Sequence, residues 1–350
     1  QTPIHFISLR VLLGIAEAGF FPGVIYLLSL WFPSRYRARM IASFYLGVPI
    51  AQIIGAPLSV GLMEMGDAWG FVGWRLMYIV EAVPAVILGV VCYFYLTDHP
   101  ADAHWLTDKQ RNWLINTLAQ EERNKPLVVG VQPTKGQMIR KALCNRQVWL
   151  LALVYFGITS GSNAMNFFMP TVLASFRGTF GLEIGLMQNG LITAIPYAVA
   201  AVAMIWWSRR SDRLQERHWH AGGAAMLAAV SIAVALWLNQ PWIIVIGFIL
   251  LAMGVYSAIN VFWAVPGQVL TGVGAAVGIG LINSIGNLSG FIGPYLTGYL
   301  FTVTGSYTPG FLVIAALVGA GGLGMVLMPR NKVSLGNAAG ATSATVGGKA

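Results

Sequence analysis

Nine long apolar stretches constrain the fold of this 350-residue chain more than any other feature of its sequence. A membrane-spanning helix needs about 20 mostly apolar residues. Stretches that meet this length lie at about 7–32, 41–63, 74–96, 147–173, 188–208, 219–238, 242–265, 275–301 and 309–328. Only 9% of the residues are charged, whereas soluble domains carry about 25%. The sequence therefore predicts an all-α integral membrane protein with nine transmembrane helices.

The positive charges predict how these helices are oriented. Nearly all of the 21 Lys and Arg residues fall at 33–40, 97–146 and 209–218 and in the C-terminal tail, which are all on one side of the predicted spans. Cytoplasmic loops are enriched in Lys and Arg. We therefore expect this side and the C-terminus to be cytoplasmic, in the cell (inner/plasma) membrane. The charges make no stripe, so the net charge of +9 does not indicate nucleic-acid binding.

The distribution of the spans divides the chain into four segments. Residues 1–96 hold three predicted spans and 147–330 hold six, with a polar linker at 97–146 between them. The tail at 331–350 is rich in Ala, Gly and Ser, and we expect it to be disordered. Within the linker, Thr107 and Gln110 have the spacing of a capping box and predict the start of an amphipathic helix. This helix is expected to lie against the membrane or the bundle.

An internal similarity indicates that the two larger segments are related. Residues Gly55–Gly61 in the second span resemble Gly293–Gly298 in the eighth, and both carry Pro-x-x-x-Gly near the predicted outer end. Transporters are often built from repeated halves. A repeat unit of six helices would give twelve, so we expect three helices to precede Gln1.

Motifs spread over nearly the whole chain are similar to those of one transporter family. They are Arg10–Gly23, Gly73–Arg75, Ser211–Arg213 with Arg217, Phe262–Pro266 and Asn283–Pro294. In that order they resemble the fourth helix, the sixth helix, the loop between helices eight and nine, and helices ten and eleven of the major facilitator superfamily, in particular its anion:cation symporter family. The resemblance implies two six-helix bundles that rock around a central site, here lacking the first three helices. It also implies that protons drive the uptake of an organic anion.

Two acidic residues lie inside the predicted spans. Placing a charge there costs about 2.5–3.5 kcal/mol on insertion scales, so such residues usually face a cavity or a partner. Glu17 lies two helical turns after Arg10, at a separation of about 10 Å along one face. We interpret Glu17 as a proton carrier influenced by Arg10, a role that the family resemblance also implies; the alternative is a buried structural pair. For Glu81, beside Pro84, we expect a structural or gating role.

Polar side chains inside the spans are candidates for binding substrate, because amide and hydroxyl groups suit a carboxylated, hydroxylated solute. The candidates are Tyr155, Ser160, Asn163, Asn166, Tyr256, Asn260, Trp263, Asn283 and Asn287, with Gln52 as a weaker one. Hydrogen bonding between helices is the alternative reading of each. We prefer Asn163, Asn283 and Asn287. Asp212, Arg213 and Arg217 are expected to form a charge network that holds one conformation, although they could serve as a topology signal alone.

These patterns favour a proton-coupled symporter that imports a small organic anion, such as a sugar acid, a dicarboxylate or an aromatic acid, and functions as a monomer in the lipid bilayer. An exporter or uniporter on the same fold, and a non-transporting membrane sensor or scaffold, remain alternatives. The sequence holds neither a phosphate-binding Gly-x-x-x-x-Gly-Lys loop nor a His-Glu-x-x-His metal pair. We therefore expect no enzymatic activity, no metal and no cofactor other than the coupling proton.

Overall fold

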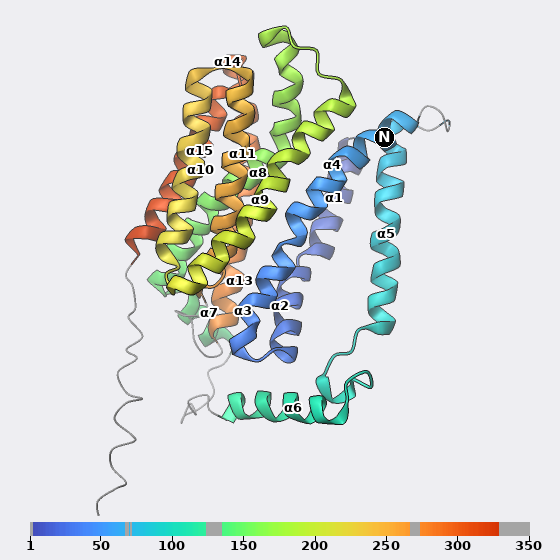
Figure 1. Cartoon of the computed structure of the whole chain (residues 1–350), viewed down its shortest axis with the longest axis vertical. Helices are drawn as coiled ribbons and strands as arrows, with labels where there is room; N and C mark the ends of the chain where they lie inside the picture. The colour runs from blue at the N-terminus through green and yellow to red at the C-terminus, as the bar shows by residue number, and fades with distance from the viewer. Residues whose placement is uncertain (1–2, 67–69, 71, 124–134, 267–273, 329–350) are drawn as a thin grey trace, which may run out of the picture.

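The computed structural model describes residues 3–66, 70, 72–123, 135–266 and 274–328, and these residues form helices, turns and loops without any strand. Most of the helices run roughly along the longest axis of the molecule, whereas α6 lies across it at one end (Figure 1). The prediction of an all-α protein is confirmed. The predicted disordered tail at 331–350 lies outside the described residues.

The first part of the chain contributes five helices with little buried apolar surface. They are α1 (Pro3–Glu17), α2 (Phe20–Trp31), α3 (Ser34–Tyr45), α4 (Gly47–Gly66) and α5 (Gly73–Tyr95). Their apolar side chains are largely exposed, as in α5, where Leu76 alone is buried. Such apolar surface is compatible with lipid as the surrounding solvent.

The second part of the chain forms a compact helical bundle. Its helices are α8 (Arg146–Phe180), α9 (Leu186–Leu214), α10 (His218–Leu238), α11 (Pro241–Phe262), α13 (Gly274–Asn287), α14 (Ser289–Thr304) and α15 (Thr308–Leu327). Of the buried apolar side chains in the described residues, all but Leu76 and Ala103 lie between Val148 and Met328. Small residues allow the closest contacts: a Cβ atom on Gly254 of α11 would lie 2.4 Å from the Ala224 carbonyl oxygen of α10.

Seven helical segments of the described chain are long and apolar enough to cross a membrane. They are Arg39–Gly66, Gly73–Tyr95, Arg146–Phe176, Leu186–Leu214, His218–Leu238, Pro241–Phe262 and Thr308–Leu327. The two other predicted spans each consist of two shorter helices in succession. The span at 7–32 is divided between α1 and α2 at Ala18 and Gly19, and the span at 275–301 is divided between α13 and α14 at Leu288. The count of nine therefore stays a prediction.

Helix α4 connects the two parts of the chain because it packs along α9 (Figure 1). Gly190 of α9 makes this approach possible: a Cβ atom there would lie 3.1 Å from Val60 Cγ2 and 3.2 Å from the Ala56 carbonyl oxygen. On the other side of α4 lies α5. The close packing of α4 against α9 thus depends on the absence of a side chain at Gly190.

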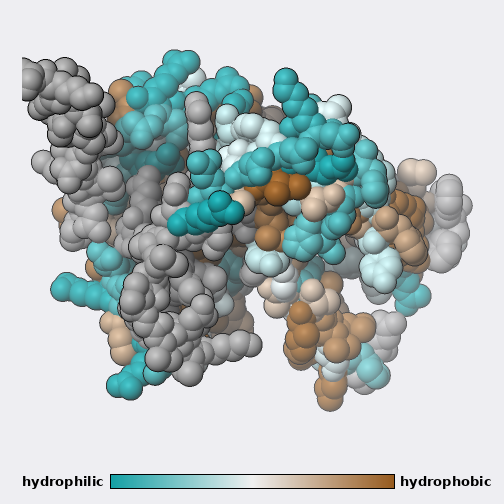
Figure 2. All heavy atoms as spheres, turned by 90° about the horizontal axis from the view of Figure 1, so that it is seen from below, coloured by the Kyte–Doolittle hydropathy of each residue, from teal (hydrophilic) through white to brown (hydrophobic). Residues whose placement is uncertain are grey.

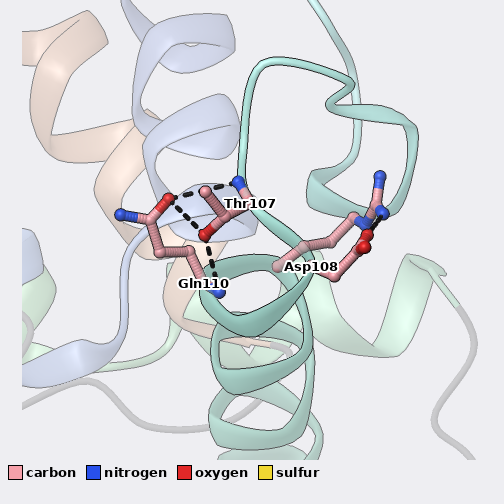
Figure 3. Close-up of polar contacts among 4 residues, drawn as sticks. Thr107, Asp108 and Gln110 are labelled. Atoms are coloured by element: carbon pink, nitrogen blue, oxygen red, sulfur yellow. Dashed lines mark hydrogen bonds and ion pairs between the residues drawn. The ribbon is translucent and has the colours of Figure 1, made fainter.

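The linker begins with a short 3-10 turn at Pro100–Asp102 and continues with α6 (Asp108–Arg123) and α7 (Lys135–Leu143). The predicted capping box is confirmed: the Thr107 backbone N–H donates to Gln110 Oε1 at 3.2 Å, and the Gln110 N–H donates to Thr107 Oγ1 at 3.4 Å (Figure 3). Asp108 also pairs with Arg111 in the first turn. Hydrophilic groups gather at this end of the molecule, with hydrophobic ones beside them (Figure 2).

Candidate functional site

A chain of hydrogen bonds connects the two parts of the molecule inside the predicted membrane spans. Asn166 Oδ1 of α8 accepts a bond of 2.6 Å from the Tyr197 hydroxyl of α9 and one of 3.5 Å from Gln52 Nε2 of α4. Tyr197 is only 1% exposed. The structure therefore brings together two of the predicted substrate-binding residues, Gln52 and Asn166. With Tyr197, they form a cluster to which three different helices each contribute one residue.

Tyr256 of α11 extends this cluster. Its ring packs against that of Tyr197, with 5.9 Å between the ring centroids, and the residue is 1% exposed. Its hydroxyl makes no hydrogen bond of normal geometry with any described residue. A buried hydroxyl without a partner costs stability, on the order of 1–3 kcal/mol. Such a group inside a transmembrane cluster is suited to bind a polar solute.

A second polar group lies where α8 meets α14. Asn163 Nδ2 donates to Ser289 Oγ at 2.9 Å, and Ser289 Oγ lies 3.0 Å from Thr159 Oγ1. Thr159 also donates to the Gly286 carbonyl oxygen at 3.1 Å, at the end of α13. These bonds give the side chains of Asn163, Ser289 and Thr159 partners within the protein. Here Asn163 bonds to a neighbouring helix, which was the alternative to substrate contact.

Aromatic side chains from both parts of the chain pack against one another. Tyr155 of α8 stacks on Phe262 at 5.0 Å and meets Trp263 edge-on at 4.9 Å between ring centroids. Phe21 of α2 lies 5.4 Å from the Trp263 ring and 6.1 Å from that of Tyr45. Predicted residues Tyr155 and Trp263 therefore belong to an aromatic layer that extends from the second part of the chain to the first.

A cavity of about 500 Å³ opens on the predicted cytoplasmic side of this aromatic layer. Its walls come from the segment Arg39–Leu46, from α9, and from the end of α11 with Trp263 and Ala264. We call it the arginine cavity, because its described lining residues include four arginines, Arg39, Arg209, Arg213 and Arg217, and one acidic residue, Asp212. The predicted binding residues Asn260 and Trp263 line the inner wall of this cavity.

The predicted charge network is present in part. Arg217 forms an ion pair of 3.1 Å with Asp212, in which the Arg217 side chain is 17% exposed and that of Asp212 60%. Arg213 forms no ion pair with a described residue. Beside the pair, Asn260 Nδ2 of α11 donates to Ser208 Oγ of α9 at 2.8 Å. The ends of α9 and α11 are thereby joined at the cavity wall.

The remaining predicted residues lie apart from these clusters. Arg10 of α1 donates to the Tyr78 hydroxyl at 3.4 Å, and no ion pair joins it to Glu17 in the described part of the chain. Glu81 of α5 accepts a hydrogen bond from Ser59 of α4. Other predicted residues are Asn283, which is half-buried, and Asn287, which is exposed on the last turn of α13. The structure thus does not gather the proton-coupling candidates and the substrate-binding candidates into one cluster.

The sequence analysis did not identify several residues of the cluster around Asn166 and of the arginine cavity. Tyr197 follows Pro196 in an apolar span, and only this location inside a span could have indicated it. Arg39 and Arg209 were interpreted only as topology signals, although they line the arginine cavity. In the described ranges, no group of three or more His, Cys, Asp or Glu side chains could hold a metal ion.

Comparison with known proteins relates the chain to membrane transporters. The family model described as Major Facilitator Superfamily matches residues 1–294. A putative tartrate transporter of Agrobacterium vitis is 41% identical over 318 residues, which cover 91% of this chain and 68% of the relative. The inner membrane transport protein RhmT of Escherichia coli is 37% identical, covering 92% of this chain and 72% of the relative. A quinolone resistance transporter of Acinetobacter baumannii is 36% identical, with 91% and 71% covered.

The fold is similar to that of a solved transporter as well. The partially occluded, inward-open structure of the xylose transporter XylE from E. coli aligns with a TM-score of 0.58 at 14% identity, covering 88% of this chain and 66% of that one. At this identity the likeness concerns the fold alone. The chain therefore spans about two thirds of the length of the proteins that it matches.

Proposed function

Because this chain belongs to the major facilitator superfamily, a family of membrane transporters, we propose that it is a proton-coupled symporter that imports a small organic anion by alternating access. Within the superfamily we assign it to the anion:cation symporter family, on the motifs in its sequence. A dicarboxylate or a sugar acid is the substrate class that we favour. A relative named as a putative tartrate transporter supports this choice.

The observation that carries the proposal is the hydrogen bond between Gln52 and Asn166 beside Tyr256, whose buried hydroxyl makes no hydrogen bond of normal geometry with a described residue. Alternating access requires that contacts between the two parts of the chain form and break. An amide-to-amide bond at 3.5 Å is long and exchanges easily for a bond to a solute. A hydroxylated carboxylate offers acceptors for Gln52 and Tyr256 and donors for Asn166, so binding such a solute would replace one interhelical contact with several.

The coupling role proposed for Glu17 follows from its place at the end of α1. The helix is interrupted directly after it, at Ala18 and Gly19. A break leaves backbone groups free to bind water or to change conformation. In the proposed cycle Glu17 takes up a proton from the outer side and releases it inward.

The test is uptake of labelled organic acids by proteoliposomes that hold the full-length protein. An acidic exterior is expected to drive uptake of a dicarboxylate or a sugar acid, and Glu17→Gln is expected to abolish this dependence while exchange of preloaded substrate survives. Glu17→Asp, which keeps a titratable group, serves as the matched control. Unchanged gradient dependence in Glu17→Gln would show that Glu17 is structural and that protons couple elsewhere.

An exporter on the same fold is the second candidate, favoured by the similarity to a quinolone resistance transporter. The same proteoliposomes separate the two directions. Under an acidic exterior a symporter accumulates its solute, whereas a proton antiporter depletes preloaded vesicles. A sensor or scaffold moves no solute under either gradient, and Glu17→Gln would then change signalling without changing flux.

A further inference from the structure

The arginine cavity carries more positive charge than the residues that the structure describes neutralise. Its single lining carboxylate, Asp212, is already paired with Arg217 at 3.1 Å. Three other lining guanidinium groups, those of Arg39, Arg209 and Arg213, form no ion pair with any residue that the structure describes. Like charges that face one cavity repel one another, so a bound anion would relieve a cost that the chain now bears.

The walls of the cavity fit a small polar ligand. Its volume of about 500 Å³ is within the range typical of ligand sites, roughly 300–1,000 Å³. Apolar side chains such as Leu46 and Met204 form part of the wall, and Ser43 and Ser208 add hydroxyl groups. Guanidinium groups bind carboxylate and phosphate oxygens in a bidentate manner. The lining thus combines solvent-exposed arginine charges with apolar and hydroxyl groups.

The cationic groups come from both parts of the chain. Arg39 is on α3, whereas Arg209 and Arg213 are on the last turns of α9. The neighbouring Arg210 does not line the cavity; its guanidinium instead lies 5.8 Å from the centroid of the Trp206 ring. An anion held between Arg39 and Arg209 would connect the middle of α3 to the last turns of α9, on the predicted cytoplasmic side of the aromatic layer.

We infer that the arginine cavity is a second anion-binding site, separate from the central polar cluster, and that its ligand is a compact dianion: a dicarboxylate, a free phosphate or a lipid phosphate. A dianion matches three unpaired guanidinium groups better than chloride does, because each anionic oxygen pair can accept from a different arginine. This inference goes beyond the proposed transport function and does not depend on it.

The test is a titration of the purified full-length protein in nanodiscs of phosphatidylcholine, followed by calorimetry at pH 8. The background variant Gln52→Ala removes one residue of the central cluster formed by Gln52, Asn166, Tyr197 and Tyr256, so that the titration reports on the cavity. Inorganic phosphate and tartrate are titrated separately, and a third series replaces part of the lipid with phosphatidic acid, whose phosphomonoester can carry two negative charges. Size-exclusion profiles and circular dichroism check that each variant is folded.

Arg39→Gln and Arg209→Gln are each expected to weaken binding of the dianion about tenfold, since each removes one charge-assisted contact. Arg210→Gln, the matched control on the adjacent position, is expected to change it less than twofold, and Arg209→Lys to retain most of it. Phosphatidic acid that binds in place of the two soluble anions, with the same dependence on Arg209, would identify a lipid phosphate as the source of the ligand.

Equal affinities in Arg209→Gln and Arg210→Gln, or no binding of any of the three probes, would overturn the inference. Loss of proton-driven uptake with intact binding at the cavity would count against the proposed function alone. Conversely, intact uptake in a protein whose cavity binds no anion would remove the second site and leave the symporter proposal unaffected.

Discussion

Asn166 Oδ1 accepts hydrogen bonds from the Tyr197 hydroxyl at 2.6 Å and from Gln52 Nε2 at 3.5 Å, so a single amide oxygen connects three helices. The shorter bond holds α8 to α9 within the second part of the chain. The longer bond crosses to α4, which is 114 residues away in sequence. The longer bond is the weaker of the two, and a carboxylate is a stronger acceptor than an amide. In the proposed cycle, Gln52 Nε2 would therefore leave the Asn166 oxygen and donate to the anionic solute.

The short bond predicts measurable coupling between Asn166 and Tyr197. Asn166→Ala leaves the buried Tyr197 hydroxyl unpaired and is expected to lower the free energy of unfolding by about 1–3 kcal/mol. Tyr197→Phe removes the hydroxyl, so adding Asn166→Ala to it should cost about 1 kcal/mol less than Asn166→Ala alone. Unfolding of the four proteins in detergent measures this coupling. Strictly additive changes would show that the two groups do not share a bond.

A second prediction concerns the contact between α10 and α11. In Gly254→Ala the new Cβ atom would lie 2.4 Å from the Ala224 carbonyl oxygen and 2.7 Å from Ala228 Cβ, so the helices must separate. Overpacking of this kind is expected to cost about 1–3 kcal/mol. Gly298→Ala is the control, since a Cβ atom there meets no described atom within 4 Å and the change gains helix propensity. Thermal unfolding in detergent should lower the Tm of the first variant only.

The long elements of this fold are predictable from composition because hydropathy depends on local sequence alone. The seven segments long enough to cross a membrane coincide with predicted spans, and the capping box at Thr107 and Gln110 is confirmed. The interruptions at Gly19 and Leu288 leave no trace in hydropathy, since both residues are apolar.

The candidate site was less predictable, since its contacts join residues that are far apart in sequence. Hydropathy and charge identified Gln52, Asn166 and Tyr256 one by one, but nothing local indicates that they meet. Arg209 and Arg210 show the same limit: they are adjacent and chemically identical, yet only Arg209 lines the cavity. That difference depends on which face of α9 meets the rest of the molecule, which tertiary packing decides.

The cap of α6 gives a prediction that is local in its effect. Thr107→Val removes the hydroxyl that accepts from the Gln110 N–H and is expected to cost about 1 kcal/mol of helix stability. Amide hydrogen exchange in the first turn of α6 should then become about fivefold faster. Thr107→Ser keeps the acceptor and should exchange like the wild type. If Thr107→Val exchanges no faster, the cap contributes nothing to the linker helix.

The approach of α4 to α9 predicts a defect in transport. Gly190→Val would place methyl groups against Val60 and the Ala56 carbonyl oxygen, where a Cβ atom alone already lies 3.1 Å and 3.2 Å from them. The larger side chain should hold the helices apart and reduce the rate of uptake about tenfold. Gly223→Val on α10 is the control, because its Cβ atom would meet only Trp219, at 3.9 Å. Equal uptake by both variants would show that this contact is not needed.

Removing the ion pair between Asp212 and Arg217 is expected to change transport without changing stability. Asp212 is 60% exposed, so Asp212→Asn should cost less than about 1 kcal/mol and leave the Tm almost unchanged. If the pair holds one conformation, the same change should alter the rate of uptake several-fold, and exchanging the two charges (Asp212→Arg with Arg217→Asp) should restore part of it. Asp212→Glu keeps the charge and should behave like the wild type.

The same substitution also gives a signed prediction for the arginine cavity. Asp212 supplies the only negative charge in its lining, so Asp212→Asn leaves four guanidinium groups without a carboxylate. Attraction for a dianion must then increase, and phosphate should bind a few-fold more tightly in the nanodisc titration. Weaker binding would mean that Asp212 positions Arg217 for the anion rather than competing with it. Unchanged uptake together with unchanged binding would leave the Asp212–Arg217 pair with a role in topology alone.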